Sequence, residues 1–387
     1  MNRFERLRRD ERGMSLVFVG LGLMAFLAAT TIALDVGTFM TARSQAQNAA
    51  DGGALAGAIA LVKNSFTDHT ANGPAVKSAI NTATKNKVIG ASPSVLSADV
   101  TFPLAPSGQS TRVKVWVYRN TTRGNPVATY LGPLFGVPTV NIGAVAMAEA
   151  APANAEKCVK PFTIPDRWVE NISPPWSTSD TFDRYYTNGP KKGQLMTPTA
   201  DAYPTASDSG YVGYSPWADK GLQLTIRAGT GNNIEPTMYF SWAMPASGGG
   251  NDYRWNIANC NTNIVRFNDP MTQEPGNMVG PTNQGVDDLI AKDPSAYWDT
   301  VKNEVHSTMS PSPRVSPLPL FDPDYYQNNK VNGRNAFLKV ANWVGFFIEG
   351  RNGNDVTGRI TPITGILDPD AGPAPNGTFP RVIRLVQ

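Results

Sequence analysis

The hydrophobic positions near the start of the chain form one unbroken run. Residues 14–34 contain no charged side chain, and ten of these 21 residues are Leu, Ile, Val or Phe. A helix rises about 1.5 Å per residue, so this run is long enough to cross roughly 30 Å of hydrocarbon. We therefore predict a transmembrane helix over 14–34. A cleaved secretory signal is the alternative, but its apolar core is only about 7–15 residues long.

Helical spacing continues beyond the apolar run, to about Lys63 and without a proline, but the residues become small. Alanines stand at 46, 49, 50, 54 and 58, and Gly53 and Gly57 are four residues apart. Small side chains let another backbone approach closely, so this face is predicted to dock a partner helix or the protein's own sheet. The pair Gly52-Gly53 is the expected point for a kink or break. A low-propensity linker is less consistent with so many alanines.

The patterns that follow alternate between helix and strand. Helical spacing marks residues 75–86, alternation marks strands at 98–102 and 111–118, and a last strand is expected at 139–150. Residues 126–136 predict a short helix broken at Gly132-Pro133. The stretch 35–150 is thus predicted to be a small α+β domain, and residues 151–157, rich in Ala and Pro, a linker.

The distal region, residues 158–387, has short apolar runs separated by turns rich in Gly, Pro and Asn. This pattern predicts a mostly-β domain. Its best helix candidate is 285–304, interrupted at Pro294. The expected strands are 221–228, 236–244, 263–267, 340–350, 358–367 and 381–387. The overall class is α+β.

Charge places the chain relative to the membrane. Residues 1–13 hold five arginines and form a predicted basic cytoplasmic leader, while Asp35 follows the apolar run. The positive-inside rule then puts the rest of the chain outside that membrane. The net charge of +3 and the lack of a long basic stripe argue against nucleic-acid binding. Cys158 and Cys260 are predicted to form a disulfide in an oxidising compartment; two buried free thiols are the alternative.

Residues 33–58 carry a motif of ordered spacing, "ALDVGTFMTARSQAQNAADGGALAGA". It resembles the N-terminal domain of TadE/TadG-like Flp (tight-adherence) pilus-assembly proteins, and the resemblance covers roughly 10–150. It implies a long helix whose second half lies on a small antiparallel sheet, a pilin-like plan. The predicted helix-packing interface joins the motif to the small residues: Asp35, Gly37, Arg43, Gln47, Asp51, Gly53, Ala54, Gly57 and Ala58.

The resemblance implies a membrane-anchored, non-enzymatic component of a Flp pilus or related secretion apparatus. Its partners would be the membrane and other pilus-assembly proteins. It would sit in the bacterial inner membrane as a single-pass protein, with a periplasmic or surface-exposed body. Type IV pilins carry a Glu five residues after the processed glycine, but counting from Gly13 that position is Phe18. An accessory or minor pseudopilin-like role is therefore expected rather than a filament subunit.

The residues offer little chemistry for catalysis. His69 and His306 lack ligand-spaced partners, no G-x-S-x-G nucleophile motif occurs, and the Asp-x-Ser-x-Ser metal loop of many TadG relatives is missing. We expect no enzyme activity, cofactor or metal, although two Asp-Pro-Asp turns could bind Ca²⁺ if they are not ordinary turns. The alternative function is an adhesive or carbohydrate-binding module that recognises a surface polymer. It would use tryptophans of the distal half, Trp168, Trp176, Trp217, Trp242 and Trp255, which otherwise belong to the core.

Overall fold

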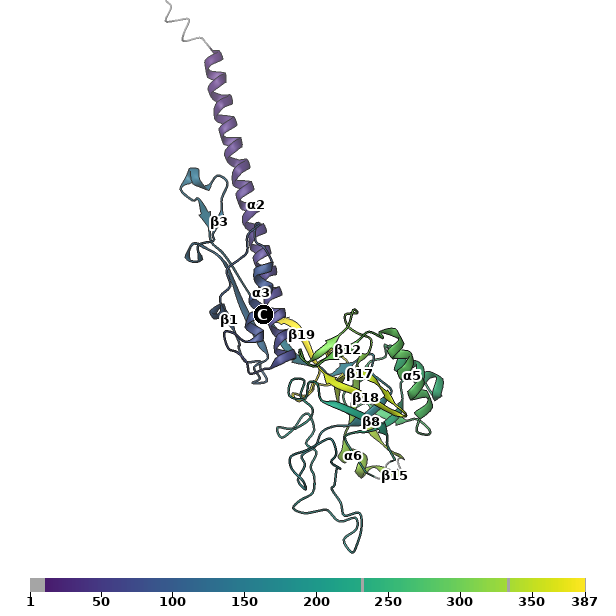
Figure 1. Ribbon diagram of the computed structural model, residues 1–387. Helices are drawn as coiled ribbons and strands as arrows, with labels where there is room; N and C mark the ends of the chain where they lie inside the picture. Colours follow the sequence, from purple (N-terminus) through teal and green to yellow (C-terminus); the bar gives the residue numbers. More distant parts are fainter. Residues whose placement is uncertain (1–10, 231–232, 333–334, 387) are drawn as a thin grey trace, which may run out of the picture. The chain divides into compact units, whose positions relative to one another are not determined.

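The computed structural model describes residues 11–230, 233–332 and 335–386 (Figure 1). The chain divides into two compact units. Unit 1 contains the described residues up to Ala60, then Thr67–Glu149, and finally Leu385 and Val386. Unit 2 contains Leu61–Phe66 and Ala150–Arg384. Most of the predicted basic leader, residues 1–10, lies outside the described residues, and Glu11 to Gly13 begin helix α2.

Helix α2 runs without interruption from Glu11 to Asn64, which is 54 residues. The predicted break at Gly52-Gly53 is therefore wrong. Gly53 is buried within the helix, where the lack of a side chain permits close packing and no change of direction is needed. Within the described part of the chain, α2 is the one helix long and apolar enough to cross a membrane, and no residue of its most apolar stretch is buried. That combination is consistent with a single-pass membrane anchor.

The rest of unit 1 is one further helix and short strands. The elements are α3 (Pro74–Lys85), β1 (Val100–Thr101), β2 (Arg112–Arg119), β3 (Val127–Ala128), β4 (Thr139–Val140) and β5 (Ile142–Pro152) as far as Glu149, with 3₁₀ turns at Ser97–Asp99, Thr121–Arg123 and Gly132–Phe135. Of β19 (Arg381–Val386), only Leu385 and Val386 belong to unit 1. One sheet has the order β1-β2-β5-β19, and β3 pairs only with β4. The helix expected at 126–136 is instead the β3–β4 hairpin with a 3₁₀ turn at its tip.

The core of unit 1 forms where α2 and α3 cover one face of the sheet. Val113, Val115 and Val117 of β2 are fully buried, as their alternation predicts. Ala75, Val76, Ala79 and Ala83 of α3 are buried as well. Because these side chains are short, the two helices and the sheet approach one another closely.

Unit 2 is built on a sheet that closes on itself. Its strands are β7 (Phe162–Pro165), β8 (Gln223–Ala228), β9 (Met238–Ala243), β11 (Pro270–Gln273), β14 (Val315–Phe321), β17 (Leu338–Asn352) and β18 (Asp355–Thr361). The order β17-β14-β7-β9-β8-β18 returns to β17, and β11 pairs with both β17 and β9. Closure leaves few unpaired strand edges. The sheet is barrel-like.

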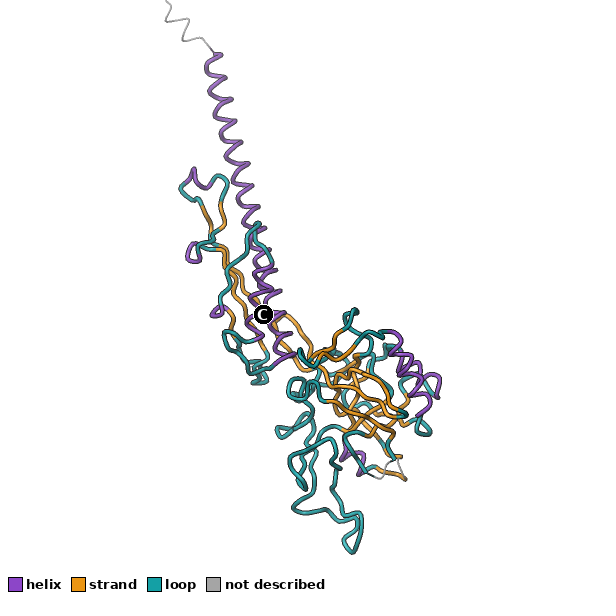
Figure 2. Tube along the Cα trace, in the orientation of Figure 1, coloured by secondary structure: helices purple, strands orange, loops and turns teal. Residues whose placement is uncertain are grey.

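Two helices pack beside this sheet, α4 (Gly249–Ala258) and α5 (Val279–Lys292), and a third, α6 (Pro323–Asn328), follows β14. Helix α5 starts earlier than the predicted 285–304 and ends before Pro294, while α4 and α6 are not anticipated by the sequence pattern. Between β7 and β8 the chain is loop, shown as long teal segments in Figure 2. Short two-strand pairings complete the unit: β6 (Ala155–Glu156) with β10 (Val265–Arg266), β12 (Tyr297–Asp299) with β13 (Glu304–His306), and β15 (Lys330–Asn332) with β16 (Asn335–Ala336).

The two cysteines and the predicted linker both lie in ordered structure. Cys158 is bonded to Cys260, with their Cα atoms 4.2 Å apart. Residues 151–157 include the end of β5 and all of β6, and most of them are buried. The described structure therefore shows strand pairing where the composition predicts a linker.

Candidate functional site

The small-residue face of α2 is packed inside unit 1. Ala54 and Ala58 are fully buried, as are the alanines one and two turns before them. A Cβ at Gly53 would lie 3.0 Å from Ala83 Cβ, and one at Gly57 would lie 2.8 Å from Val113 Cγ1. These distances leave no room for a side chain. Four residues of the predicted interface thus pack against the protein's own α3 and sheet, so this face is already occupied.

Asp35 has a different role, far from the small residues. Its carboxylate accepts hydrogen bonds from the backbone N–H of Tyr130 at 2.7 Å and of Leu131 at 3.2 Å. Both donors lie at the tip of the β3–β4 hairpin, just before its 3₁₀ turn. Asp35 therefore fastens the hairpin to α2 where the predicted membrane span ends. The sequence contains no signal for this contact, because the partners are 95 and 96 residues apart.

The exposed side of α2 carries the remaining polar residues of the interface. Gln47 donates to Asp51 Oδ1 at 2.8 Å and to the backbone oxygen of Val145 in β5 at 3.1 Å. Both side chains line a groove of about 720 Å³ within unit 1. Its other lining residues are Lys114, Val145, Ala146, Met147, Leu385 and Val386. The groove thus combines an acidic side chain (Asp51), a basic one (Lys114) and an amide (Gln47) with apolar lining residues.

Arg43 and Gly37 lie on the solvent side of the same helix. Arg43 is exposed, and a Cβ at Gly37 would meet nothing within 4 Å. Met40 is 72% exposed one turn before Arg43. Met40, Arg43, Gln47 and Asp51 succeed one another at helical spacing, and we call them the exposed row. Met40, Arg43 and Gln47 are exposed and Asp51 is half-buried, so the row is accessible to another molecule, unlike the alanine face.

Unit 2 contains a buried carboxylate that the sequence pattern does not reveal. Asp166 is fully buried and accepts hydrogen bonds from Tyr203 Oη at 2.8 Å, Tyr211 Oη at 2.6 Å and the N–H of Arg167 at 2.8 Å. Burial raises the pKa of Asp166 to about 6, and the three hydrogen bonds oppose that rise. Asn342 Nδ2 donates to Tyr211 Oη at 2.6 Å and extends the network. The cluster joins the loop region to β17, which is a structural role.

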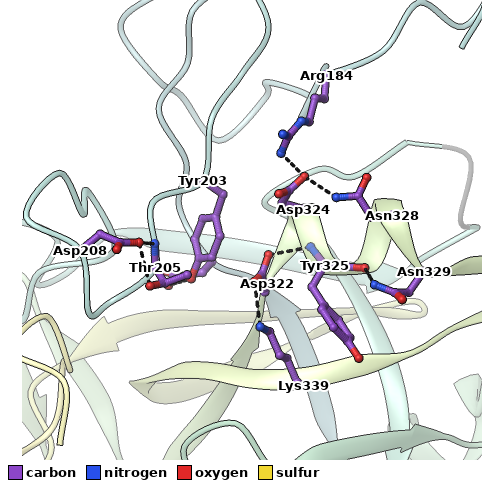
Figure 3. Close-up of polar contacts among 11 residues, drawn as sticks. Arg184, Tyr203, Thr205, Asp208, Asp322, Asp324, Tyr325, Asn328, Asn329 and Lys339 are labelled. Atoms are coloured by element: carbon purple, nitrogen blue, oxygen red, sulfur yellow. Dashed lines mark hydrogen bonds and ion pairs between the residues drawn. The ribbon is translucent and has the colours of Figure 1, made fainter. Parts of the chain in front are cut away.

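A small pocket of about 230 Å³ lies next to this cluster and is shown in part in Figure 3. Asp322 and Lys339 face each other across it, 3.4 Å apart. The other carboxylate oxygen of Asp322 accepts from the N–H of Tyr325 at 2.8 Å and caps α6. Asp322 thus balances Lys339 and satisfies a helix end, while burial raises its pKa.

The Asp-Pro-Asp turns are held by cations of the chain itself. In the first turn, Asp324 pairs with Arg184 and accepts from Asn328 at 3.0 Å (Figure 3). In the second, Asp368 lies 2.7 Å from Arg266 and accepts from the N–H of Asp370. Within the part of the chain that the structure describes, no group of three His, Cys, Asp or Glu residues could hold a metal ion.

The aromatic residues considered for polymer binding are mostly interior. Trp168 and Trp242 are buried, and Trp176 and Trp217 are half-buried. Trp255, on α4, is 53% exposed and lines a pocket of about 190 Å³. His69 stacks on Phe102 and His306 packs against Tyr297, in separate parts of the chain.

Comparison with known proteins gives one match. Residues 13–60 match the Tad family model, the TadE/G-like proteins of Flp pilus assembly. Neither the curated proteins nor the solved structures contain a match to the chain. The matched segment covers the membrane-span candidate and the alanine face of α2, a smaller part than the 10–150 over which the resemblance was expected. Over residues 13–60 the chain therefore carries the TadE/G-like segment of Flp pilus assembly, which confirms the sequence-based recognition there.

Proposed function

We propose that the protein is a single-pass, membrane-anchored, non-enzymatic component of a Flp pilus assembly machine. The family match over residues 13–60 carries the proposal, because it coincides with the helix that has an exposed apolar span. The arginines before that span favour a cytoplasmic N-terminus and a body on the other side of the bacterial inner membrane. The disulfide Cys158–Cys260 fits an oxidising compartment on that side.

An accessory or minor pseudopilin-like role fits better than that of a filament subunit. A long helix whose second half packs on an antiparallel sheet supports the pilin-like plan in unit 1. Phe18, however, stands where type IV pilins carry the glutamate used in filament packing. Unit 2 adds a large domain with a barrel-like sheet to the pilin-like plan of unit 1.

Partner docking is assigned to the exposed row and the adjoining groove. The alanine face is filled by α3 and the sheet, so a partner helix has no access to it. The row offers Met40 as an apolar contact and Arg43 as a charge, and the groove beside it has a volume of about 720 Å³. An amphipathic partner helix with an acidic residue facing Arg43 would match this surface.

Charge reversal in the native bacterium tests the proposal. Arg43→Glu should reduce co-purification of the full-length protein with Flp assembly proteins at least tenfold, because the partner's acid would then face a like charge. Lys87→Glu is the matched control, since Lys87 is an exposed cation of unit 1 that does not belong to the row. It should leave co-purification unchanged.

Two results would count against the proposal in different ways. If Arg43→Glu and the unmodified protein recover equal amounts of partners, the exposed row is not the docking surface. If the unmodified protein recovers no pilus component at all, the assignment to Flp assembly itself is wrong.

A further inference from the structure

The β3–β4 hairpin, residues 127–140, is an apolar extension of unit 1. Its sequence, "VATYLGPLFGVPTV", has no charged residue, and none occurs anywhere between Arg123 and Glu149. Two of its large side chains are strongly exposed, Tyr130 at 71% and Val137 at 49%. Among the strands that the structure describes, β3 and β4 pair only with each other, so the hairpin is separate from the main sheet. An exposed, uncharged tip of this kind marks an interaction surface.

The position of the tip along α2 indicates what lies against that surface. Asp35, which binds the N–H groups of Tyr130 and Leu131, is the first charged residue after the apolar run 14–34. Figure 1 shows the hairpin extending along α2 toward the N-terminal end of the helix, past the other strands of unit 1. The half-buried face of α2 continues in the same direction through Thr31 and Ala28. The tip therefore lies beside the C-terminal end of the predicted span 14–34.

The backbone of the tip is arranged for a medium of low polarity. The N–H groups of Tyr130 and Leu131 are taken by Asp35, and those of Thr129, Gly136 and Val137 donate to backbone oxygens of the tip itself. Pro133 and Pro138 have no N–H to satisfy. Thr129 Oγ1 donates to the oxygen of Val137 at 2.7 Å. Backbone groups in contact with lipid must be paired within the protein, and at least five of the eight N–H groups of residues 129–138 meet that condition.

We propose that the tip of the β3–β4 hairpin inserts into the interfacial layer of the bilayer that α2 crosses. Tyr130 supplies an amphipathic ring of the kind enriched at this depth, and Val137 adds apolar area. Asp35 holds the tip beside the span, so that unit 1 contacts the membrane at two points. The inference rests on the proposed function in requiring that residues 14–34 span the membrane.

Site-specific fluorescent labelling of the full-length protein in liposomes tests the insertion. The two native cysteines are bonded to each other, so an introduced cysteine is the single free thiol. Val137→Cys is labelled with an environment-sensitive dye and exposed either to aqueous iodide or to nitroxide-bearing lipids. Leu104→Cys is the matched control, exposed at 61% in unit 1 and joined to the opposite end of β2. A third label at Leu23→Cys reports on the span itself.

The expected result is that the dye at position 137 is quenched by nitroxide lipids and at least fivefold less by iodide than the dye at position 104. Asp35→Ala should release the tip and raise iodide quenching at position 137, with the label at position 23 still protected. Equal iodide quenching at positions 137 and 104, with position 23 protected, would overturn the hairpin proposal alone. Protection from iodide without nitroxide quenching would also overturn it, since the tip would then contact protein. An unprotected position 23 would refute the membrane span, and the hairpin proposal with it.

Discussion

Replacing Gly57 with alanine tests how closely α2 approaches the sheet of unit 1. An added Cβ would lie 2.8 Å from Val113 Cγ1 and 3.3 Å from Ala79 Cβ. Real carbon–carbon contacts are about 3.5–4.0 Å, so at least one neighbour must move. Val113 is fully buried and β-branched, and its side chain is stiff about χ1. Relieving this contact therefore requires α2 to move away from the sheet.

Two opposing effects set the magnitude. Alanine in place of glycine within a helix stabilises it by about 1 kcal/mol. Adding a methyl group to a well-packed core costs roughly 1–3 kcal/mol. We expect Gly57→Ala to lower the free energy of unfolding of unit 1 by up to about 2 kcal/mol. Gly37→Ala is the matched control, because a Cβ there meets nothing within 4 Å, and it should only stabilise the helix.

Native-state hydrogen exchange of the full-length protein in detergent measures this effect locally. A loss of 2 kcal/mol corresponds to roughly 30-fold faster exchange at the amides of α3 and β2, since 1.4 kcal/mol is a factor of ten. A second measurement in a Val113→Ala background removes the obstructing methyl groups. There Gly57→Ala should become neutral or stabilising, which isolates the contact as a coupling energy.

The reasoning fails if Gly57→Ala slows exchange as much as Gly37→Ala does. That outcome would mean that the sheet leaves space beside the helix, and that Gly57 has no packing role. It also fails if the effect of Gly57→Ala is the same with valine and with alanine at position 113.

Two further predictions concern unit 2. Replacing both Cys158 and Cys260 with serine opens a loop that the disulfide closes over 102 residues. In the chain-entropy account this should lower the free energy of unfolding by up to about 4–5 kcal/mol. A urea titration of the full-length protein measures the loss, and an unchanged unfolding midpoint would contradict the prediction. The pKa of Asp166 is raised from its ordinary value of 3.8 to about 6 in the folded state, so its contribution to stability is present below pH 4 and is lost as the pH rises to about 6. Asp166→Asn cannot ionise, so the unfolding free energy of this variant minus that of the unmodified protein should grow by about 2 kcal/mol between pH 4 and 6.5, whereas parallel pH profiles would refute the assignment.

Sequence patterns predict those helices and strands whose conformation is determined by their own residues. The charge-free run 14–34 and the alanines after it are sufficient for α2, and the alternating valines of 111–118 are sufficient for β2. The β-rich character of 158–387 follows from short apolar runs between turns. Helix α4 escapes prediction because Gly249 and Gly250 open it and because Asn256, one of its buried residues, is polar.

Contacts between distant residues are the part that the sequence does not reveal. The spacing of Gly53 and Gly57 indicates a close approach, but the partner could equally have been a second protein, and only the fold shows that it is α3 and β2. Asp35 belongs to the motif that identifies the segment, yet its bonds to the β3–β4 hairpin depend on where the chain returns some 95 residues later. Asp166, Tyr203 and Tyr211 likewise meet only through folding.

The continuity of α2 has a mechanical consequence. The same 54-residue helix, about 80 Å long, holds the span and the buried alanines of unit 1, with no joint between them. A pull along the helix axis, as a growing or retracting fibre would exert, loads the contacts of α2 with α3 and β2 in shear. Many contacts then share the force instead of separating one at a time. Torque on the predicted span 14–34 is likewise transmitted along the continuous helix into the core of unit 1.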